Sequence, residues 1–284
     1  RLRCVTGVQT CALPISDLRA PLDVEETSRV SVEDDYTLII VDVPTPEERN
    51  SRSYFITIPL GIIVTETAVI TTCLESLTLF DNFWSHRIRN FYTFMKTRFV
   101  FQLLYRNAGL YLTALRSIDR QSDKIEAQLE KATRNEQLID MMELEKSIVY
   151  LRASLKLNER IVKKLSSNTS SLKKYVEDED LLEDTLIETQ QAIEMAGIYE
   201  NVLNVMTETS ASIISNNQNT IMKTLALMTM ALDIPTVIFS AYGMNFQNNW
   251  LPLNGLNHAF WYIVLIAAAM CAIVVIYFIR KKWF

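Results

Sequence analysis

The feature that most limits what this chain can fold into is an uncharged apolar segment near its C-terminus. Residues 259–279, AFWYIVLIAAAMCAIVVIYFI, contain no Asp, Glu, Lys or Arg. An α-helix needs about 20 apolar residues to cross a bilayer, and the core helices of soluble proteins are rarely apolar all round at that length. The segment therefore predicts a membrane-spanning helix.

The flanks of this segment predict its orientation. Aromatic residues lie at both of its ends, at 260–262 and at 277, as at the two surfaces of a bilayer. The basic run 280–282 follows directly and places the C-terminus in the cytoplasm, whereas the connector before the segment has no Lys or Arg and is expected outside. We expect a multi-pass protein with both termini in the cytoplasm. We expect no secretory signal, because the apolar segments are C-terminal.

A second apolar segment, residues 219–243, carries an ordered set of small and polar positions. Alternating steps of three and four residues connect them, and mostly apolar residues lie between. A seven-residue repeat keeps such a stripe on one side of a helix. It fits either close helix packing or the lining of a water-filled path. This polar stripe consists of positions that are small or polar except for Met222: Asn219, Met222, Ala226, Thr229, Asp233, Thr236, Ser240 and Gly243.

Asp233 favours the water-filled path. An ionisable group near the membrane interior is costly and usually faces a partner or water. The only basic side chain in either predicted span is Lys223, which begins about 15 Å away along the helix at about 1.5 Å per residue. A passing cation is therefore the better partner for Asp233.

The polar stripe continues before the membrane. The same steps lead back to Ser215, Ser212 and Glu208, and residues 180–218 contain no proline and a single glycine. These features predict one long helix that enters the bilayer from a cytoplasmic stalk. Pro235 lies in the membrane part, where neighbouring helices can absorb a kink.

Several motifs occur together at the C-terminal end. They are NTIMK at 219–223, a proline seven residues before the tetrapeptide YGMN at 242–245, a short connector, a second span and the ending RKKWF. This combination resembles the CorA family of magnesium transporters over about residues 30–284. The resemblance implies a homopentameric channel in the cytoplasmic (inner) membrane, with the first span lining the pore. It further implies that Mg²⁺ is the transported ion and a regulatory ligand, with no other cofactor.

The resemblance also assigns a selectivity filter to Gly243, Met244 and Asn245 at the external mouth. Mg²⁺ dehydrates reluctantly, and Asn245 offers a neutral amide oxygen that five subunits would repeat as a ring. Gly243 is expected to let the backbone turn at the helix end, and Met244 to pack the loop.

Two acidic residues of the stalk receive roles from the same resemblance. By its spacing from the GMN motif, Asp184 matches acidic residues that bind regulatory Mg²⁺ at subunit contacts, and Glu208 is a candidate acidic ring below the pore. Asp233 departs from the family pattern, since its position is apolar in the best-known members.

The upstream part predicts a soluble domain. Residues 103–165 have apolar positions at helical spacing among opposite charges, and they predict two or more polar helices. Residues 34–44 and 52–73 carry strand signals split by proline and glycine, which resemble a partial cytoplasmic α/β domain. Residues 1–16, RLRCVTGVQTCALPIS, resemble translated sequencing-adapter sequence, so we interpret them as non-native and exclude them from fold reasoning.

The predicted fold class is an α+β membrane protein: a partial cytoplasmic α/β domain, a long helical stalk and two C-terminal transmembrane helices per subunit of a homopentamer. The domains are 1–16, a non-native stretch; 17–100, the α/β domain; 101–218, the helical domain and stalk; 219–243, the pore-lining helix; 244–258, the external loop; 259–279, the second transmembrane helix; and 280–284, the basic tail.

Other chemistry has little support in the sequence. Cys4 and Cys11 lie in the excluded stretch, Cys73 in a predicted strand and Cys271 in a membrane helix, without disulfide or zinc spacing. His86 and His258 are too far apart in sequence and context to propose as co-ligands. No phosphate-binding glycine loop and no nucleophile–base set is present, so we expect no enzyme and no nucleic-acid partner.

Three functional classes stay open. The first is a divalent-cation channel, with Mg²⁺ as the ion or with Zn²⁺, Co²⁺ or Ni²⁺ in its place. The second is a non-transporting membrane anchor for a helical interaction module, which would need neither the polar stripe nor Asp233. The third, a membrane-bound hydrolase, lacks a catalytic constellation. The partners common to the first two are membrane lipid and other copies of the chain.

Overall fold

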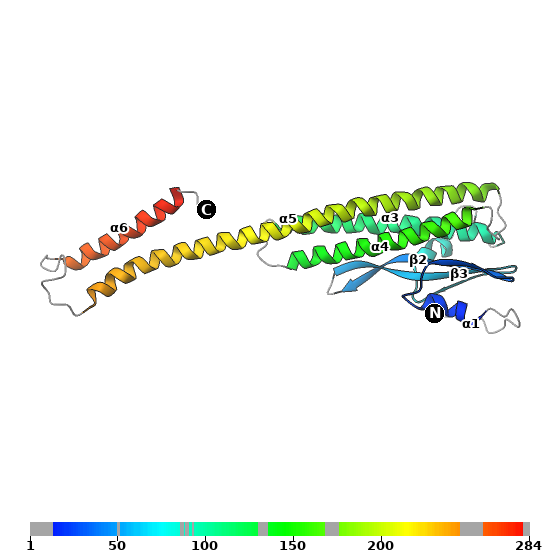
Figure 1. Cartoon of the computed structure of the whole chain (residues 1–284), viewed down its shortest axis with the longest axis horizontal. Coiled ribbons are helices and arrows are strands. Elements are labelled where there is room, and N and C mark those ends of the chain that lie inside the picture. Colours follow the sequence, from blue (N-terminus) through cyan, green and yellow to red (C-terminus); the bar gives the residue numbers. More distant parts are fainter. Residues whose placement is uncertain are drawn as a thin grey trace. The chain divides into compact units, whose positions relative to one another are not determined.

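The computed structural model describes residues 14–49, 52–85, 88, 91–92, 94–129, 136–167, 176–244 and 258–280 (Figure 1). The chain divides into two compact units. The first comprises Arg1–Gln128 and Glu136–Thr209, and the second comprises Leu129–Asn135 and Ser210–Phe284. One helix, α5 (Val176–Tyr242), contributes residues to both units.

The first unit contains a four-stranded antiparallel sheet of order β1-β2-β3-β4. Its strands are β1 (Arg29–Val32), β2 (Tyr36–Arg49), β3 (Arg52–Thr65) and β4 (Val69–Cys73). The strands predicted within 34–44 and 52–73 are therefore confirmed, as is the strand position of Cys73. The described strands form no parallel pair, so this unit is α+β, and the predicted α/β domain is wrong in that respect.

The prolines do not split the strands as expected. β2 continues through Pro44 and Pro46, and β3 continues through Pro59. β1 pairs with β2 only as far as Ile40, and β4 pairs with β3 only from Leu60 onward. Each proline thus lies where its strand has one sheet neighbour, and a missing N–H on the free side costs no ladder hydrogen bond.

Two long helices complete the first unit, α3 (Lys96–Leu129) and α4 (Glu136–Ser166), which confirms the helical prediction for 103–165. Short elements precede them: α1 (Ile15–Arg19), η1 (Ala20–Leu22), η2 (Thr78–Phe80) and α2 (Asp81–Trp84). Because α1 begins at Ile15, it includes the last two residues of the stretch that the sequence analysis excluded.

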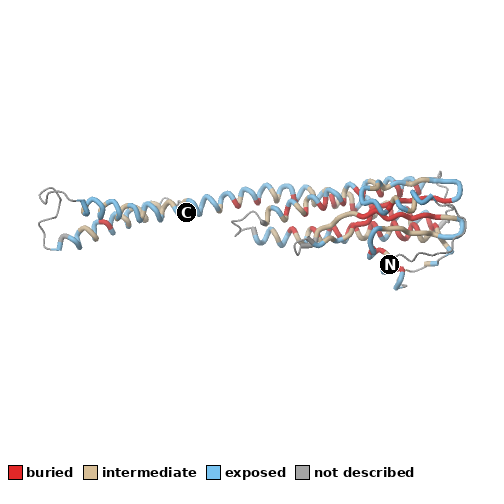
Figure 2. Tube along the Cα trace, turned by 90° about the horizontal axis from the view of Figure 1, so that it is seen from below, coloured by how far each residue is buried: buried red, intermediate tan, exposed pale blue. Residues whose placement is uncertain are grey.

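The core lies on both faces of the sheet. Ile39, Val41 and Leu60 pack against residues of α3, α4 and α5. On the opposite face, Leu38 and Ile40 pack against α1 and η1. The two-residue alternation along the strands thus supplies an apolar layer to each side. Figure 2 shows this buried material concentrated in the strands and the inner faces of the helices.

The second unit contains the C-terminal part of α5 and the helix α6 (Ala259–Arg280), so the predicted single long helix and the helical position of Cys271 are confirmed. α5 passes through Pro235 without ending. A proline has no N–H, so the carbonyl of Ala231, four residues earlier, loses its helical donor. The thiol of Cys271 in α6 donates to that carbonyl oxygen at 2.8 Å. A neighbouring helix therefore compensates for the proline, as expected.

Candidate functional site

Within the described part of the chain, two helices are long and apolar enough to cross a membrane, Asp178–Tyr242 in α5 and Phe260–Phe278 in α6. In the first helix, none of the most apolar 18-residue window is buried. In the second helix, 6% of the corresponding window is buried. A core helix of a soluble protein would bury such a window. In the second unit, by contrast, the apolar parts of α5 and α6 are largely exposed (Figure 2). Length, composition and exposure together are those of membrane-spanning helices.

α6 covers one side of α5. Leu227, Ala231, Ile234 and Ile238 are half-buried at steps of three and four residues, and Cys271 contacts this side. The polar stripe lies on the other side, because a residue two positions after Ala231 is turned by about 160° at 3.6 residues per turn. Ala226 is half-buried, and the other stripe residues are exposed: Asn219, Met222, Thr229, Asp233, Thr236, Ser240 and Gly243.

The contact between Cys271 and Ala231 fixes the register of the two helices. Lys223 lies eight positions before Ala231 on α5, and Arg280 lies nine positions after Cys271 on α6. Since the chain returns after α5, the helices run in opposite directions (Figure 1). At about 1.5 Å per residue, Lys223 and Arg280 lie about 12 and 14 Å from the contact in the same direction. The two basic residues therefore share one level.

The ends of α5 and α6 away from Lys223 and Arg280 carry aromatic residues, which form a second level. Tyr242 and Phe260 each lie eleven positions from the contact, on the other side of it. The distance between the basic and aromatic levels is about 29 Å, close to the thickness of about 30 Å of a bilayer's hydrocarbon core. Asp233 lies ten positions above Lys223 and nine below Tyr242. Asp233 therefore lies about midway between the basic level and the aromatic level, at mid-depth of the apolar layer.

Two threonines of the polar stripe have their hydroxyl protons engaged. Thr229 donates to the carbonyl oxygens of Leu225 and Ala226 at 3.2 and 2.9 Å, and Thr236 donates to that of Leu232 at 2.7 Å. Such bonds to the preceding turn leave the lone pairs of the hydroxyl oxygens free as acceptors. Together with Asp233, the exposed side of α5 thus offers oxygen acceptors, which suits a cation.

The predicted selectivity filter is only partly within the described residues. α5 ends at Tyr242, and the N–H of Gly243 still donates to the carbonyls of Phe239 and Ser240 at 2.9 and 3.2 Å. Gly243 has no positive φ, and a Cβ on it would meet these oxygens at 3.4 and 3.5 Å. The turn therefore does not require glycine, contrary to expectation. Met244 is 55% exposed, and Asn245 lies outside the described residues.

The exposed side of α5 extends further than the sequence analysis proposed. Glu208, Ser212 and Ser215 are exposed, and the same steps of three and four lead back to Asp184 through exposed positions. We call this whole set, Asp184 to Gly243, the exposed seam. Its added members are Ile187, Gln191, Glu194, Ile198, Asn201 and Val205. Buried positions of the first unit repeat with similar spacing on another face: Leu182, Thr185, Thr189, Ala192, Ala196 and Leu203.

The predicted regulatory site is not assembled by one chain. Asp184 is exposed on α5, and the described residues contain no group of three His, Cys, Asp or Glu side chains placed to hold a metal ion. From the sequence, Asp184 and the polar stripe are predicted as separate features. Their common seven-residue repeat was the signal that could have joined them.

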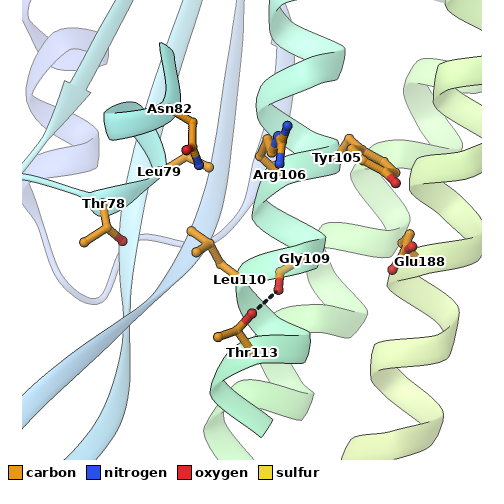
Figure 3. A pocket seen from close by; sticks show the side chains of 9 residues that line it. All are labelled: Thr78, Leu79, Asn82, Tyr105, Arg106, Gly109, Leu110, Thr113 and Glu188. Atoms are coloured by element: carbon orange, nitrogen blue, oxygen red, sulfur yellow. Dashed lines mark hydrogen bonds between the residues drawn. The ribbon is translucent and has the colours of Figure 1, made fainter. Parts of the chain in front are cut away.

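A pocket of about 320 Å³ opens in the first unit between η2, α2, α3 and α5 (Figure 3). Arg106 and Glu188 are the charged residues that line it, and Asn82 and Thr113 add an amide and a hydroxyl. The hydroxyl of Thr113 donates to the carbonyl of Gly109 at 2.9 Å. With one carboxylate among its lining residues, the pocket does not supply the paired acidic ligands expected for a regulatory divalent-cation site.

The first unit also buries an acidic residue that the sequence analysis missed. Asp42 of β2 is 8% exposed and lies just beyond Ile40, where β1 stops pairing. The Asn158 side chain replaces the missing strand, since its Oδ1 accepts from the N–H of Asp42 at 3.1 Å and its Nδ2 donates to the Asp42 carbonyl at 2.8 Å. Asn107 and Tyr111 donate to the same carbonyl at 2.8 and 3.2 Å.

Burial raises the pKa of the Asp42 carboxyl, and hydrogen bonds with Ser154 and Ser28 act in the opposite direction. Burial and the nearby Asp42 charge raise the pKa of the Tyr111 hydroxyl well above its usual value. These groups join the sheet to α3 and α4, and they are a structural polar cluster rather than a part of the exposed seam.

The chain is similar to known proteins that all carry the same family name. The family described as "CorA-like Mg2+ transporter protein" matches residues 8–281. This match begins earlier than residue 30, where the resemblance was expected to start, and inside the stretch 1–16. The cobalt/magnesium transport protein CorA of Methanocaldococcus jannaschii is 28% identical over an alignment of 285 positions that covers 95% of this chain and 84% of that protein. The magnesium transport protein CorA of Helicobacter pylori is 28% identical over 157 residues, 54% of this chain and 47% of that protein.

Solved structures show the same fold. The complete CorA magnesium transporter from Methanocaldococcus jannaschii has a TM-score of 0.71 at 24% identity, with 96% of this chain and 84% of that chain covered. The full-length CmaX protein has a TM-score of 0.63 at 16% identity, with 97% and 83% covered.

Proposed function

The chain belongs to the family of CorA-like Mg²⁺ transporters, and from this membership we propose that it is a Mg²⁺ channel of the cytoplasmic membrane with a homopentameric pore. The exposed seam of α5 faces the pore axis, and α6 lies outside it. Both termini lie in the cytoplasm, in accordance with the basic residues at 280–282.

One observation carries this proposal. Asp233 lies at mid-depth of the apolar layer, on the side of α5 that α6 leaves uncovered. Among the described residues, no hydrogen bond or ion pair involves its side chain. A carboxylate turned toward lipid at this depth would cost several kcal/mol, whereas copies of the chain around an axis would give it water and a cation. A membrane anchor without transport would need no such residue.

The seam supplies each step of ion passage. Glu208 attracts cations at the cytoplasmic end, and Met222 forms an apolar constriction that resists passage when dry. Asp233 and the hydroxyl oxygens of Thr229 and Thr236 accept the hydration shell of the ion, which Mg²⁺ tends to keep. The filter at Gly243, Met244 and Asn245 forms the external mouth. The remaining pore-lining positions are Ser212, Ser215, Asn219, Ala226 and Ser240.

Regulation and metal preference follow from the same ligand chemistry. Asp184 is proposed to bind Mg²⁺ together with groups of a neighbouring subunit and to hold the channel shut, as the family resemblance implies. Carboxylate, amide and hydroxyl oxygens are hard ligands, which favour Mg²⁺ over softer metals. Co²⁺ is the first alternative, because the relative from Methanocaldococcus jannaschii is named a cobalt/magnesium transport protein. Zn²⁺ and Ni²⁺ follow.

Metal-resolved uptake into liposomes tests the proposal. The purified full chain is reconstituted, and the entry of Mg²⁺, Co²⁺, Zn²⁺ and Ni²⁺ is measured separately against protein-free vesicles. We expect Mg²⁺ entry, reduced about tenfold by Asp233→Asn, as a loss of about 1.4 kcal/mol in ion stabilisation would produce. Glu179→Gln is the matched control, because it removes an exposed carboxylate of α5 on a face other than that of the seam. Wild-type vesicles that admit none of the four metals would refute the channel function, and unchanged flux in Asp233→Asn would refute the role of Asp233 alone.

A further inference from the structure

The basic level of the second unit has no acidic counterpart among the described residues of that unit. Lys223 and Arg280 lie at the same height, where the apolar layer ends. On α5 there is no Asp or Glu between Glu208 and Asp233, and the chain has none after Asp233. Among the described residues, no hydrogen bond or ion pair involves the side chain of Lys223 or of Arg280. The compensating negative charge is therefore not supplied by the described residues of the second unit.

The positions of the two side chains indicate where that charge lies. Arg280 follows Cys271 by nine positions, or two and a half turns, so it lies on the side of α6 that faces away from α5. It is exposed there. Lys223 is half-buried on the flank of α5, between the side covered by α6 and the exposed seam. Both residues thus lie outside the seam, at the boundary between apolar and polar surroundings.

We propose that Lys223 and Arg280 bind the phosphate groups of anionic phospholipids at the membrane surface where the C-terminus lies. A guanidinium matches two phosphate oxygens at once, and an ammonium on a long stem reaches a phosphate while its methylenes stay in the apolar layer. Basic residues at this depth are attracted by anionic headgroups within a Debye length. The lipid is favoured over free phosphate because an apolar residue lies one turn from each basic residue on the same helix face, the half-buried Leu227 after Lys223 and the exposed Tyr277 before Arg280.

Thermal unfolding of the full chain in vesicles tests this proposal. The midpoint is measured in phosphatidylcholine alone and in equal parts of phosphatidylcholine and phosphatidylglycerol. We expect phosphatidylglycerol to raise the midpoint of the wild type, and the double variant Lys223→Gln with Arg280→Gln to lose about half of that rise or more. The charge-preserving variants Lys223→Arg and Arg280→Lys should keep it, which also shows that the altered positions still fold.

Three results would overturn the proposal. The first is an equal phosphatidylglycerol effect in the wild type and the double variant. The second is an equal loss in Lys156→Gln, a matched removal of an exposed positive charge on α4, because the effect would then be one of net charge. The third is an equal rise when inorganic phosphate is added to the protein in phosphatidylcholine. The readout does not depend on which ion crosses the membrane, so it is separate from the test of the channel.

Discussion

At the scale of single residues, Gly61 illustrates how the sheet admits a second layer. A Cβ on Gly61 of β3 would lie 2.2 Å from Cγ of Pro21 and 2.7 Å from Oγ1 of Thr72. Neither distance is compatible with a real contact, so alanine would displace η1 from the sheet. We expect Gly61→Ala to lower the free energy of unfolding by about 1–3 kcal/mol, measured by denaturant titration.

Gly109→Ala provides the control for Gly61→Ala. Gly109 lies inside α3, and a Cβ there would have nothing within 4 Å. Alanine is favoured over glycine in a helix by about 0.8–1.0 kcal/mol, so the control should be neutral or stabilising. A loss of stability in Gly109→Ala as large as that in Gly61→Ala would show that close contact is not the cause.

Asp42 gives the first unit a pH-dependent contribution to stability. Because burial raises the pKa of its carboxyl from the ordinary value of 3.8, the folded protein holds this proton more tightly than the unfolded chain. The stabilising contribution is full at pH below about 4 and is lost as the pH rises through the raised pKa. We expect Asp42→Asn, which does not titrate, to gain stability relative to the wild type as the pH rises from about 4 toward neutral.

Parallel thermal melts of the two proteins across that pH range check the sign. Other groups titrate in both proteins and cancel in the difference. A difference that stays constant with pH would mean that Asp42 keeps its ordinary pKa, and one that shrinks would mean that its charged form is the stabilised one.

At the scale of elements, the pairing of α5 with α6 depends on a backbone defect. Pro235 leaves the carbonyl of Ala231 without a helical donor, and Cys271 supplies one at 2.8 Å. We expect Cys271→Ala to destabilise the folded protein by about 0.5–1.5 kcal/mol, and Cys271→Ser to retain most of the stability because a hydroxyl also donates. Reversible unfolding in mixed detergent micelles measures these differences.

A double-mutant cycle isolates the contact. Pro235→Ala restores an N–H to α5, which can donate to the Ala231 carbonyl within the helix. In that background Cys271→Ala should cost less than it does in the wild type, with a coupling of about 0.5–1 kcal/mol. Additive effects would show that Cys271 contributes through packing rather than through this hydrogen bond.

The elements also show which features the sequence could predict. The apolar segment 259–279 and the spacing of the polar stripe predicted α6 and the exposed side of α5, because length and helical period are local properties. The partners of Ala231 and Asp42 depend on residues distant in sequence, Cys271 and Asn158, so no local pattern could indicate them. The prolines of β2 and β3 were misread for a related reason, since whether a strand position has one neighbour or two is set by the whole sheet.

At the scale of the whole molecule, the proposed channel requires other copies of the chain around the exposed seam. Asp184 and Asp233 precede Gly243 by 59 and 10 positions on the same seven-residue repeat. All three residues are exposed in a single chain. All copies in a membrane share one orientation, so a symmetric ring places the same seam position of every copy at the same height around the axis. The sites proposed for conduction and regulation are thus properties of the assembly.

Neighbouring positions on α5 distinguish this assembly from any other arrangement. Ser212 belongs to the exposed seam, whereas the adjacent Ala211, also exposed, is turned by about 100° from it. We expect Ser212→Cys in native membranes to be joined between chains by a short bismaleimide several times faster than Ala211→Cys, above the background of the parent chain with its own cysteines. The rates are compared on denaturing gels, with a monofunctional maleimide to show that both thiols react equally well. If Ala211→Cys joins as fast as Ser212→Cys, the seam does not face the axis, and the placement of Asp233 in the ion path falls with it.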